Sequence, residues 1–339
     1  MQAAYFVRPG VLELRDGPEP RLEASDDVIV EVEVAGLCGT DLHIVSVPQL
    51  HPAGEGIILG HEFVGRVVAV GGAVERLRPG DRVIAGPNVA CGQCDACRRG
   101  RRSLCAFNTT LGITRDGGFA ELARVPLQCL YPIPPGLAPE LAVFAEPLSC
   151  VMNGLQRVAG QRRERAVVLG AGPIGLYFLR LLRHSGTLER FATEPIASRR
   201  EAARVSGATD ILDPSNGDVV AEVLEKTAGG VDLVVDTTGH QLAEATRMVR
   251  PGGTVLVIGM DATCTAGVRV FDMVRQEKTI TGCFVNNDLI PVALDIIPSL
   301  SLHELITHRF ALAEIHQALA ALRDGSSLKA LVDLRRRPT

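Results

Sequence analysis

The sequence predicts an α/β protein of two domains, with a strand-rich region followed by a doubly wound parallel sheet that helices cover. Up to about residue 150, β-branched runs such as VIVEVEVAG and EFVGRVVAVG are separated by Gly and Pro, which is typical of short strands with tight turns. From about residue 155, short apolar strands alternate with segments of helix length, which is the pattern of a parallel sheet with crossover helices. A chain of 339 residues, 46% of them hydrophobic, is long enough to build both cores.

The individual elements of the second region follow from its apolar runs. AVVLG is the first short buried strand, and PIGLYFLRLLRHSG is the helix after it, with Pro173 at its start and Gly186 at its end. VDLVVDTTG, TVLVIG and TITGCF are further buried strands, spaced so that helices fit between them. The tail adds an amphipathic helix, LAEIHQALAALRDG, and a strand, KALVDL.

Charge and composition exclude several classes of protein. The formal net charge of -4 gives no global basic field, so we expect no nucleic-acid or membrane partner. No run of about eighteen apolar residues exists that could span a bilayer. The start, MQAAYFVRPG, lacks a basic segment followed by an apolar one, so we expect no signal peptide. Nine cysteines, several beside metal-type partners, favour a reducing cytoplasm over a disulfide framework.

A glycine-rich turn in the second region predicts a dinucleotide site of the Rossmann type. The motif follows a strand and opens a helix, so that the helix N-terminus faces the pyrophosphate. Glu194 ends the next strand, where a carboxylate binds a ribose 2'-hydroxyl and repels a 2'-phosphate, which favours NAD over NADP. Arg199 weakens that preference, because a nearby arginine can accept the phosphate. The expected cofactor residues are Gly170, Gly172, Pro173, Ile174, Gly175, Glu194 and Arg199.

Four cysteines in the segment CGQCDACRRGRRSLC predict a structural zinc site. Cys91, Cys94 and Cys97 are three residues apart, and Cys105 follows eight residues later. Thiolates this close suit a tetrahedral four-sulfur site, which has no open position for water or substrate. The four arginines of the loop offset the negative charge of such a site. Disulfides or free thiols are the alternatives, and a nucleic-acid finger is disfavoured because the chain is acidic and lacks interleaved aromatic residues.

Two further segments, GLCGTDLH at 36–43 and GHE at 60–62, carry residue types that bind metals. Either segment alone is unremarkable, because a buried cysteine is usually a small apolar residue and a lone histidine is usually a satisfied polar group. In this order, together with the four-cysteine loop and the GAGPIG turn, they resemble the zinc-dependent medium-chain alcohol and polyol dehydrogenases. The resemblance covers essentially the whole chain, from the first strands to THRF near residue 310.

The resemblance implies a catalytic zinc ion with an open coordination position, and hence two zinc ions per chain. Cys38 and His61 match two ligands of that ion. Glu146, in an Ala-Glu-Pro-Leu-Ser context, matches the third ligand of the sorbitol-type branch. Glu62 matches a carboxylate that in the family either ligates directly or steps back. One thiolate, one carboxylate and a neutral imidazole leave the site near neutral, and zinc there acts as a Lewis acid.

The resemblance also implies the groups around the metal. Asp41 matches a carboxylate that orients the ligand histidine. Thr40 and His43 match a relay that takes the substrate proton through the cofactor ribose to solvent. The alkoxide carbon then gives a hydride to the nicotinamide ring. In this architecture a GroES-like, β-rich catalytic domain at 1–150 is completed by 285–339, and a Rossmann domain occupies 151–284. Homodimers or homotetramers are usual in the family.

The sequence departs from the sorbitol-type pattern after the TITG strand. Members of that branch typically carry Phe-Arg-Tyr there, and the Arg and Tyr contact the polyol chain. Here Phe284 is followed by Val285, Asn286 and Asn287. The two asparagines either bind other hydroxyls or amines in the substrate, or only cap a turn. Phe119, in ITRDGGFAE, is a further candidate for the substrate pocket.

Three hypotheses for the function follow. The leading one is a zinc-dependent, NAD-preferring dehydrogenase that oxidises a secondary hydroxyl of a polyol, sugar or cyclitol. A second is a different substrate for the same chemistry, such as the amino alcohol threonine or a sugar unit of a larger, aminoglycoside-type metabolite. A third, of another class, is a non-catalytic zinc- and NAD-binding protein, against which the intact set of ligand and relay residues argues.

Overall fold

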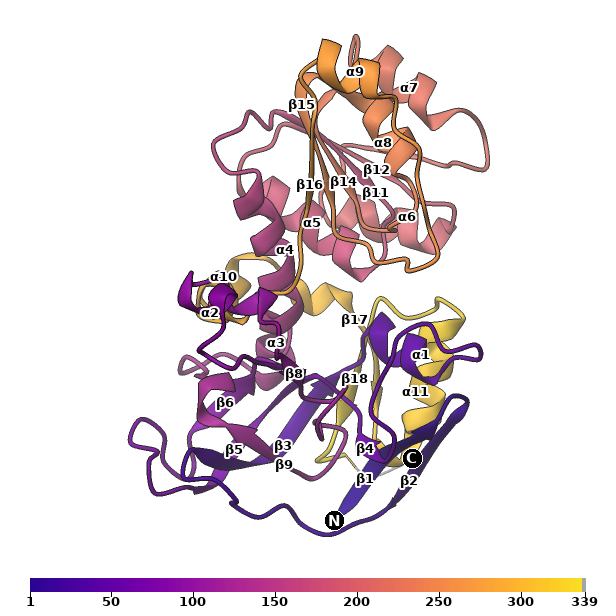
Figure 1. Cartoon of the computed structure of the whole chain (residues 1–339). Coiled ribbons are helices and arrows are strands. Elements are labelled where there is room, and N and C mark those ends of the chain that lie inside the picture. The colour runs from indigo at the N-terminus through magenta and orange to yellow at the C-terminus, as the bar shows by residue number, and fades with distance from the viewer. Residues whose placement is uncertain (337–339) are drawn as a thin grey trace. The chain divides into compact units, whose positions relative to one another are not determined.

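The computed structural model describes residues 1–336 and divides into two compact units (Figure 1). The first unit comprises Met1–Ser149 and the chain from Asn286 onward, and the second comprises Cys150–Val285. The sequence predicts 1–150 with 285–339 for one domain and 151–284 for the other. The strand-rich first unit and the parallel sheet of the second confirm the predicted fold class.

The first unit is organised around a seven-stranded sheet in the order β10-β6-β5-β3-β18-β17, with β9 also paired to β3. Its members are β3 (Asp27–Gly36), β5 (Glu62–Val70), β6 (Arg82–Ala85), β9 (Leu122–Pro126), β10 (Leu130–Pro132), β17 (Ile306–Phe310) and β18 (Lys329–Asp333). Strand β18 therefore inserts the end of the chain directly beside β3, with Leu331 opposite Gly36. This pairing brings residues from the two sequence pieces of the unit into one core.

Smaller elements surround this sheet. A three-stranded sheet has the order β2-β1-β4, and a two-stranded ribbon joins β7 to β8. Their bounds are β1 (Gln2–Arg8), β2 (Val11–Asp16), β4 (Ile57–Ile58), β7 (Asn88–Val89) and β8 (Thr109–Thr110). The helices of the unit are α1 (Gly39–Val45), α2 (Asp95–Arg98), α3 (Pro139–Ala142), α10 (Ile290–Ile296) and α11 (Ile315–Arg323). The predicted C-terminal helix is shorter than its apolar pattern, because residues Leu312–Glu314 form a 3-10 turn before it.

The second unit holds a six-stranded sheet in the order β13-β12-β11-β14-β15-β16, and every pairing in it is parallel. The strands are β11 (Arg165–Leu169), β12 (Glu189–Thr193), β13 (Asp210–Leu212), β14 (Val231–Asp236), β15 (Val249–Val257) and β16 (Thr279–Gly282). The helices are α5 (Pro173–His184), α6 (Ala197–Val205), α7 (Val219–Lys226), α8 (Leu242–Met248) and α9 (Val270–Arg275). This spatial order, in which the first strand of the unit lies centrally, is the Rossmann arrangement.

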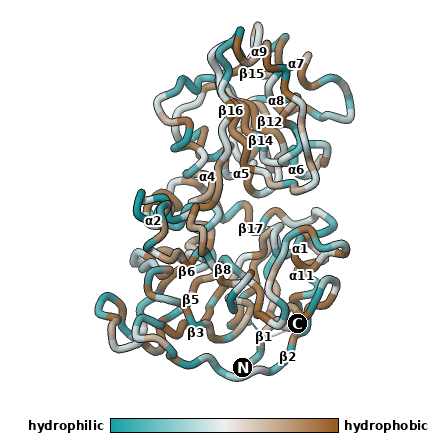
Figure 2. The backbone as a smooth tube through the Cα atoms, viewed as in Figure 1, coloured by the Kyte–Doolittle hydropathy of each residue, from teal (hydrophilic) through white to brown (hydrophobic). Residues whose placement is uncertain are grey.

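Continuous apolar runs explain why these strands lie in the middle of their unit. All six residues of β14 are buried, and Figure 2 shows the strands of this sheet as hydrophobic segments. A strand that is covered on both faces needs no polar side, which is why the sequence of β14 does not alternate. The helix α4 (Ala145–Arg157) carries the chain out of the first unit and into the second. No helix within residues 1–336 combines the length and the apolar composition that a membrane span requires.

Candidate functional site

The first unit brings together three side chains that suit a metal ion. Potential ligand atoms of Cys38, His61 and Glu62 all lie within 4.8 Å of one another. Cys38 is the residue before α1, and His61 and Glu62 stand at the start of β5. Antiparallel pairing of β3 with β5 sets Gly36 opposite Glu62, so the two sequence segments meet where β3 ends. The predicted cysteine and histidine ligands are thus neighbours in space.

Asp41 contacts both Cys38 and His61. Its carboxylate is fully buried, and Oδ2 accepts a hydrogen bond of 2.9 Å from the backbone N–H of Cys38. Its other oxygen lies 3.3 Å from Nδ1 of His61. Burial lowers the pKa of His61, but the charges of Asp41 and Cys38 outweigh burial and raise it well above its usual value. A cation is therefore favoured at this position, as expected of a site that binds a metal.

Glu146 lies in the first turn of α4, is 5% exposed, and stands outside the compact group of three ligand atoms. Burial and the neighbouring charge of Glu62 raise the pKa of its carboxyl to about 7, and the positive groups His61 and Lys329 oppose that shift. Its carboxyl is thus close enough to the cluster to feel these charges. Side chains that are buried, acidic and close to a thiol and an imidazole fit the ligand chemistry of zinc.

The two residues expected to relay a proton lie on α1. The hydroxyl of Thr40 is 3.7 Å from Sγ of Cys38, so it stands beside the metal cluster. His43 is one turn further along the helix and is exposed. The two side chains thus lie on a path from the cluster toward solvent. Their role as a relay stays a prediction.

Lys329, the first residue of β18, is a part of the site that the sequence analysis missed. Its side chain is 3% exposed and forms an ion pair with Glu62. Its ammonium also donates a 3.3 Å hydrogen bond to the carbonyl oxygen of Leu37, the residue before Cys38. Only a weak feature of the sequence indicates that Lys329 belongs to the site. The chain has only three lysines, and this one opens an apolar strand where a charged residue is unusual.

The dinucleotide motif of the second unit has the geometry that its glycines predict. Gly170 follows β11 with φ of +87°, which a residue with a side chain adopts only with strain. A Cβ atom on Gly175 would lie 2.0 Å from the carbonyl oxygen of Gly170, so only glycine permits this tight turn. Gly172, Pro173 and Ile174 then lead directly into α5, whose N-terminus is a favourable place for phosphate.

Glu194 stands directly after β12 and is fixed by backbone donors. Its two carboxylate oxygens accept hydrogen bonds from the N–H groups of Ala171, at 2.9 Å, and Ile196, at 3.0 Å. Arg200 forms an ion pair with Asp213 at 2.8 Å, so its guanidinium is engaged on this side of the turn. The carboxylate is therefore an anchored negative charge beside the glycine turn.

The four-cysteine loop forms a second compact cluster, in which all four sulfur atoms lie within 4.8 Å of one another. The Sγ atoms of Cys94 and Cys97 are 3.5 Å apart, those of Cys94 and Cys105 are 3.9 Å apart, and those of Cys91 and Cys97 are 4.0 Å apart. A regular tetrahedron with zinc–sulfur bonds of about 2.3 Å has sulfur–sulfur edges of about 3.8 Å. Disulfide bonds need about 2.05 Å, and these cysteines are free thiols.

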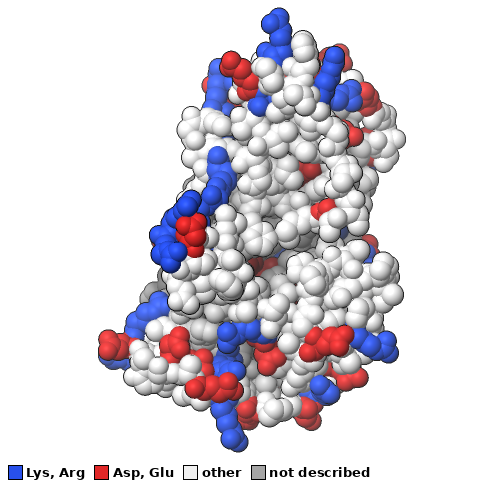
Figure 3. Space-filling model, in the orientation of Figure 1, with Lys and Arg blue, Asp and Glu red and all other residues white. Residues whose placement is uncertain are grey.

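Backbone groups and charge also suit a metal in this loop. The N–H groups of Cys97 and Ala106 lower the pKa of Cys94 to about 6, whereas burial and the other thiols raise that of Cys97 to about 12. Backbone N–H groups of Cys91 and Cys94 point at the sulfur atoms of Cys105 and Cys91. Figure 3 shows basic side chains gathered over α2, within this loop. The loop thus stabilises thiolate charge from several directions.

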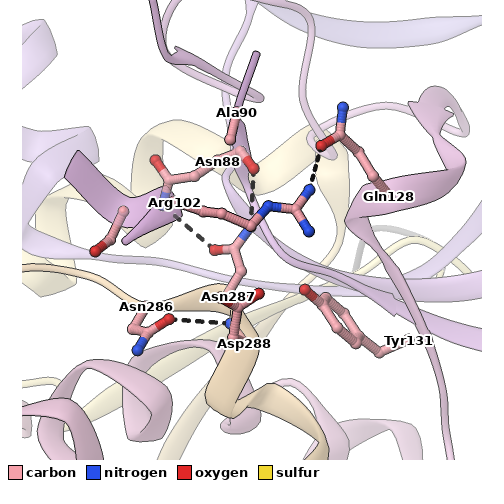
Figure 4. Close-up of a pocket in the computed structure, with 9 residues that line it drawn as sticks. Asn88, Ala90, Arg102, Gln128, Tyr131, Asn286, Asn287 and Asp288 are labelled. Atoms are coloured by element: carbon pink, nitrogen blue, oxygen red, sulfur yellow. Dashed lines mark hydrogen bonds between the residues drawn. The ribbon is translucent and has the colours of Figure 1, made fainter. Parts of the chain in front are cut away.

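Asn287 forms two hydrogen bonds with Asn88, and Arg102 of the four-cysteine loop lies beside this pair (Figure 4). The amide of Asn287 donates to the carbonyl oxygen of Asn88 at 3.0 Å and accepts from its side chain at 3.3 Å. Asn286 accepts a 3.2 Å hydrogen bond from the backbone N–H of Asp288 and so caps a 3-10 turn. The pocket beside them has a volume of about 10 Å³, barely that of one water molecule. The capping alternative therefore describes these contacts better than substrate binding.

Phe119 is also buried within the first unit. Its ring is fully buried, and a Cβ on Gly60 would approach it to 2.6 Å. A ring without exposed area cannot touch a substrate in this conformation, so the structure does not support the expected contact. Instead, Phe119 packs beneath the turn that carries His61 and supports the backbone there.

Two family models match parts of this chain. Residues 24–135 match the family model "Alcohol dehydrogenase GroES-like domain", and residues 173–299 match "Zinc-binding dehydrogenase". A D-altritol 5-dehydrogenase from Agrobacterium fabrum is 35% identical, over 93% of this chain and 94% of its own length. An L-threonine 3-dehydrogenase from Pyrococcus horikoshii is 35% identical, over 72% of this chain and 71% of its own.

A solved structure extends the likeness to three dimensions. A zinc-binding dehydrogenase from Sinorhizobium meliloti 1021, bound to NADP, has a TM-score of 0.93 and 33% identity. The match covers 98% of each chain.

Proposed function

Because this chain belongs to the zinc-dependent medium-chain alcohol and polyol dehydrogenase family, we propose that it oxidises a secondary hydroxyl of a polyol, sugar or cyclitol and transfers the hydride to NAD. The observation that carries this proposal is the cluster of Cys38, His61 and Glu62, with Asp41 behind it. A purely structural metal site has no need of an exposed histidine and a hydroxyl leading away from it, whereas an oxidation that releases a proton does.

Cys38, His61 and Glu146 are the residues proposed to hold the catalytic zinc. When bound there, zinc supplies Lewis-acid chemistry that makes a substrate hydroxyl easier to deprotonate. Asp41 fixes the ring of His61, so that the ligand nitrogen faces the metal. Thr40, whose hydroxyl lies beside Cys38, would take up the proton of the substrate hydroxyl while it passes its own proton onward, and His43 would release a proton to solvent. Cys91, Cys94, Cys97 and Cys105 are proposed to hold a second, structural zinc.

The proposed preference for NAD over NADP is supported by the anchored carboxylate of Glu194. Two backbone N–H groups hold it in place, so it cannot easily swing aside for a 2'-phosphate. The carboxylate also has an acceptor lone pair for each ribose hydroxyl. Arg200 is engaged by Asp213 and is not free to offset the repulsion.

The polyol class is favoured over threonine by the ligand set. Glu146 stands in the Glu-Pro-Leu-Ser context of the sorbitol-type branch, and one relative, a D-altritol 5-dehydrogenase, matches 93% of the chain. Threonine is retained as the second candidate, because threonine dehydrogenases are equally identical over the part they match. The two classes differ in charge, since a threonine site must pair an ammonium and a carboxylate.

A homo-oligomer is proposed from the far edge of the second unit's sheet. Within residues 1–336, β16 pairs with β15 alone. The nearby α9 exposes Val270, Phe271 and Val274 at 72, 65 and 75%. An unpaired strand edge beside three exposed apolar side chains is a surface that a second copy can cover. Size measurement by light scattering, with Val274→Asp as a disruptive variant and Val292→Asp as a control, tests this assignment.

A cytoplasmic location is proposed from the state of the thiols. All nine cysteines are free, and the four that lie closest together are spaced for a metal. Such thiols persist in a reducing compartment.

The decisive experiment measures reduced nicotinamide formation by zinc-loaded protein. NAD or NADP is supplied with a panel of polyols, hexoses, cyclitols, threonine and aminoglycosides. We expect turnover of a polyol or cyclitol with NAD, and its loss in Cys38→Ser and Glu146→Ala, both of which keep NAD binding. Full activity in either variant contradicts the assigned zinc ligands. Turnover of threonine alone selects the second candidate.

A further inference from the structure

The loop that carries the four cysteines has almost no core of its own. From Cys91 to Phe107, only Cys105 is buried, and the two helical turns within the loop contain no buried residue. We call the segments at its two ends, Asn88–Val89 and Asn108–Thr110, the base of the loop. There β7 and β8 pair over only two residue pairs. A ribbon this short is marginally stable by itself, so side-chain contacts at the base contribute to keeping it closed.

Side-chain hydrogen bonds join the two ends of the loop at its base. The amide of Asn108 donates to Oδ1 of Asn88 at 3.0 Å. The hydroxyl of Thr110 donates to the same oxygen at 3.4 Å. The side chain of Asn88 is therefore the point at which both ends meet, and a contact that fixes Asn88 also fixes the base.

Asn287 makes such a contact from a distant part of the sequence (Figure 4). Its amide nitrogen donates to the carbonyl oxygen of Asn88 at 3.0 Å, and its oxygen accepts from the side-chain amide of Asn88 at 3.3 Å. The fold leaves space for this approach at Gly86, where a Cβ would lie 2.8 Å from Cγ of Asn287. Asparagine suits the position because its side chain both donates and accepts, whereas an aspartate only accepts and a leucine does neither.

A second segment also supports the loop. Arg102, inside the loop, donates a 2.5 Å hydrogen bond to Oε1 of Gln128 (Figure 4). The thiol of the next residue, Cys129, donates to the carbonyl oxygen of Asn88 at 3.5 Å. Cys129 thus contacts the main chain of Asn88, whereas Asn287 contacts both its main chain and its side chain. The contact with Asn287 is therefore the one that orients the side chain on which the base depends.

We propose that Asn287 is a positioning residue for the structural metal, because it keeps the base of the four-cysteine loop closed and so slows the release of zinc from it. This inference rests on the proposed function, since it presumes a zinc ion in the loop. Cys91 comes three residues after Asn88 at one end of the loop. Cys105 comes three residues before Asn108 at the other end. Opening of the base therefore separates sulfur atoms that one ion must bind together.

A purely local role for Asn287 makes a different prediction. In that case its side chain stabilises only the turn that leads into α10, and its loss lowers stability without an effect on the metal. The neighbouring Asn286 supplies the matched control, because its side chain caps the same 3-10 turn by accepting from the backbone N–H of Asp288.

The test measures the rate of zinc release into an excess of a chromophoric chelator. Cys38→Ser protein is the parent, so that the remaining zinc lies in the four-cysteine loop. We expect release about tenfold faster in Asn287→Leu and in Asn287→Asp, because the hydrogen bonds to Asn88 are lost or opposed. Asn286→Ala should lower the melting temperature but release zinc at the parent rate. Hydrogen exchange supplies a second readout, since the backbone amides of 88–110 should exchange faster in Asn287→Leu than in Asn286→Ala.

Two results overturn the proposal. One is release at the parent rate from folded Asn287→Leu protein. The other is equally fast release from Asn286→Ala, which shows that any loosening of the turn opens the loop. If neither Asn287 variant folds, Asn108→Ala decides, because it breaks the base from its other end. Faster release from that variant supports the proposal, and an unchanged rate overturns it.

Failure of the proposed function is seen separately. A Cys38→Ser parent that contains no zinc contradicts the proposed structural zinc, and with it this inference, before any asparagine is changed.

Discussion

The carboxylate of Asp41 lies 3.3 Å from Nδ1 of His61, while its other oxygen holds the backbone N–H of Cys38 at 2.9 Å. One buried side chain thus fixes two of the proposed ligands at once. It does so from the turn that follows β3, because Asp41 is three residues after Cys38 at the start of α1. We therefore expect the geometry of a bound metal to depend on this residue, although it is not one of the proposed ligands.

Asp41→Asn should lower both zinc affinity and kcat/KM by about 10- to 100-fold. The amide retains an oxygen for the N–H of Cys38, but it presents a neutral group to His61 and no longer favours the required ring orientation. Zinc affinity is measured by competition with a chromophoric chelator. Glu55→Gln, a change at an exposed carboxylate in the same unit, is the matched control and should behave as wild type. Unchanged zinc affinity in Asp41→Asn would show that the contact with His61 is incidental.

Cys94→Ser should remove one zinc ion per chain and lower thermal stability before it affects chemistry. Loss of a bound metal is strongly destabilising. A decrease of about 3 kcal/mol in the free energy of unfolding corresponds to a fall in Tm of about 6–12 °C for a unit of this size. Metal content and thermal melts are the measurements. Cys264→Ser, outside both clusters, should keep two zinc ions. A full complement of zinc in Cys94→Ser would mean that three thiolates suffice.

Motif order and residue chemistry predicted the parts of the fold and site that are local in sequence. The spacing of GAGPIG predicted a turn between strand and helix, and the structure places it between β11 and α5. Lys329 escaped prediction because its partner Glu62 lies 267 residues away, and no local pattern marks the pairing of β18 with β3. Asn287 was ambiguous for the same reason, since its partner Asn88 is 199 residues distant. The cap formed by Asn286 involves a residue only two positions away, and a capping role for the asparagines is one of the two alternatives that the sequence leaves open.

Glu194→Gln should shift cofactor preference toward NADP. Removing the charge relieves repulsion of a 2'-phosphate, which is worth several kcal/mol at contact distance near a protein surface, so the ratio of kcat/KM for NAD to that for NADP should fall at least about tenfold. Steady-state kinetics with both cofactors measure this ratio. Glu189→Gln is the control, because this half-exposed carboxylate of β12 pairs with Arg165 of the neighbouring strand β11. Equal use of the two cofactors by wild type would remove the assigned role of Glu194.

Asp232 should stabilise the second unit in a manner that depends on pH. Its carboxylate, in β14, accepts hydrogen bonds from the backbone N–H of Arg165 at 2.8 Å and from the guanidinium of Arg250 at 2.6 Å. Burial alone raises the pKa of this carboxyl, but these two partners outweigh burial and hold the pKa below its usual value.

The sign of the effect follows from that shift. A carboxyl whose pKa is lower in the folded state stabilises the protein at pH values above the unfolded pKa of about 3.9, and the stabilisation is lost as the pH falls through the folded pKa. Asp232→Asn should therefore cost about 1.5–3 kcal/mol at neutral pH, and the difference from wild type should shrink below about pH 4. Urea unfolding at several pH values measures it. Glu201→Gln, in an exposed ion pair with Arg204, should change stability by less than about 0.5 kcal/mol throughout. A difference for Asp232→Asn that stays constant down to pH 3 would show that packing, and not charge, is what Asp232 contributes.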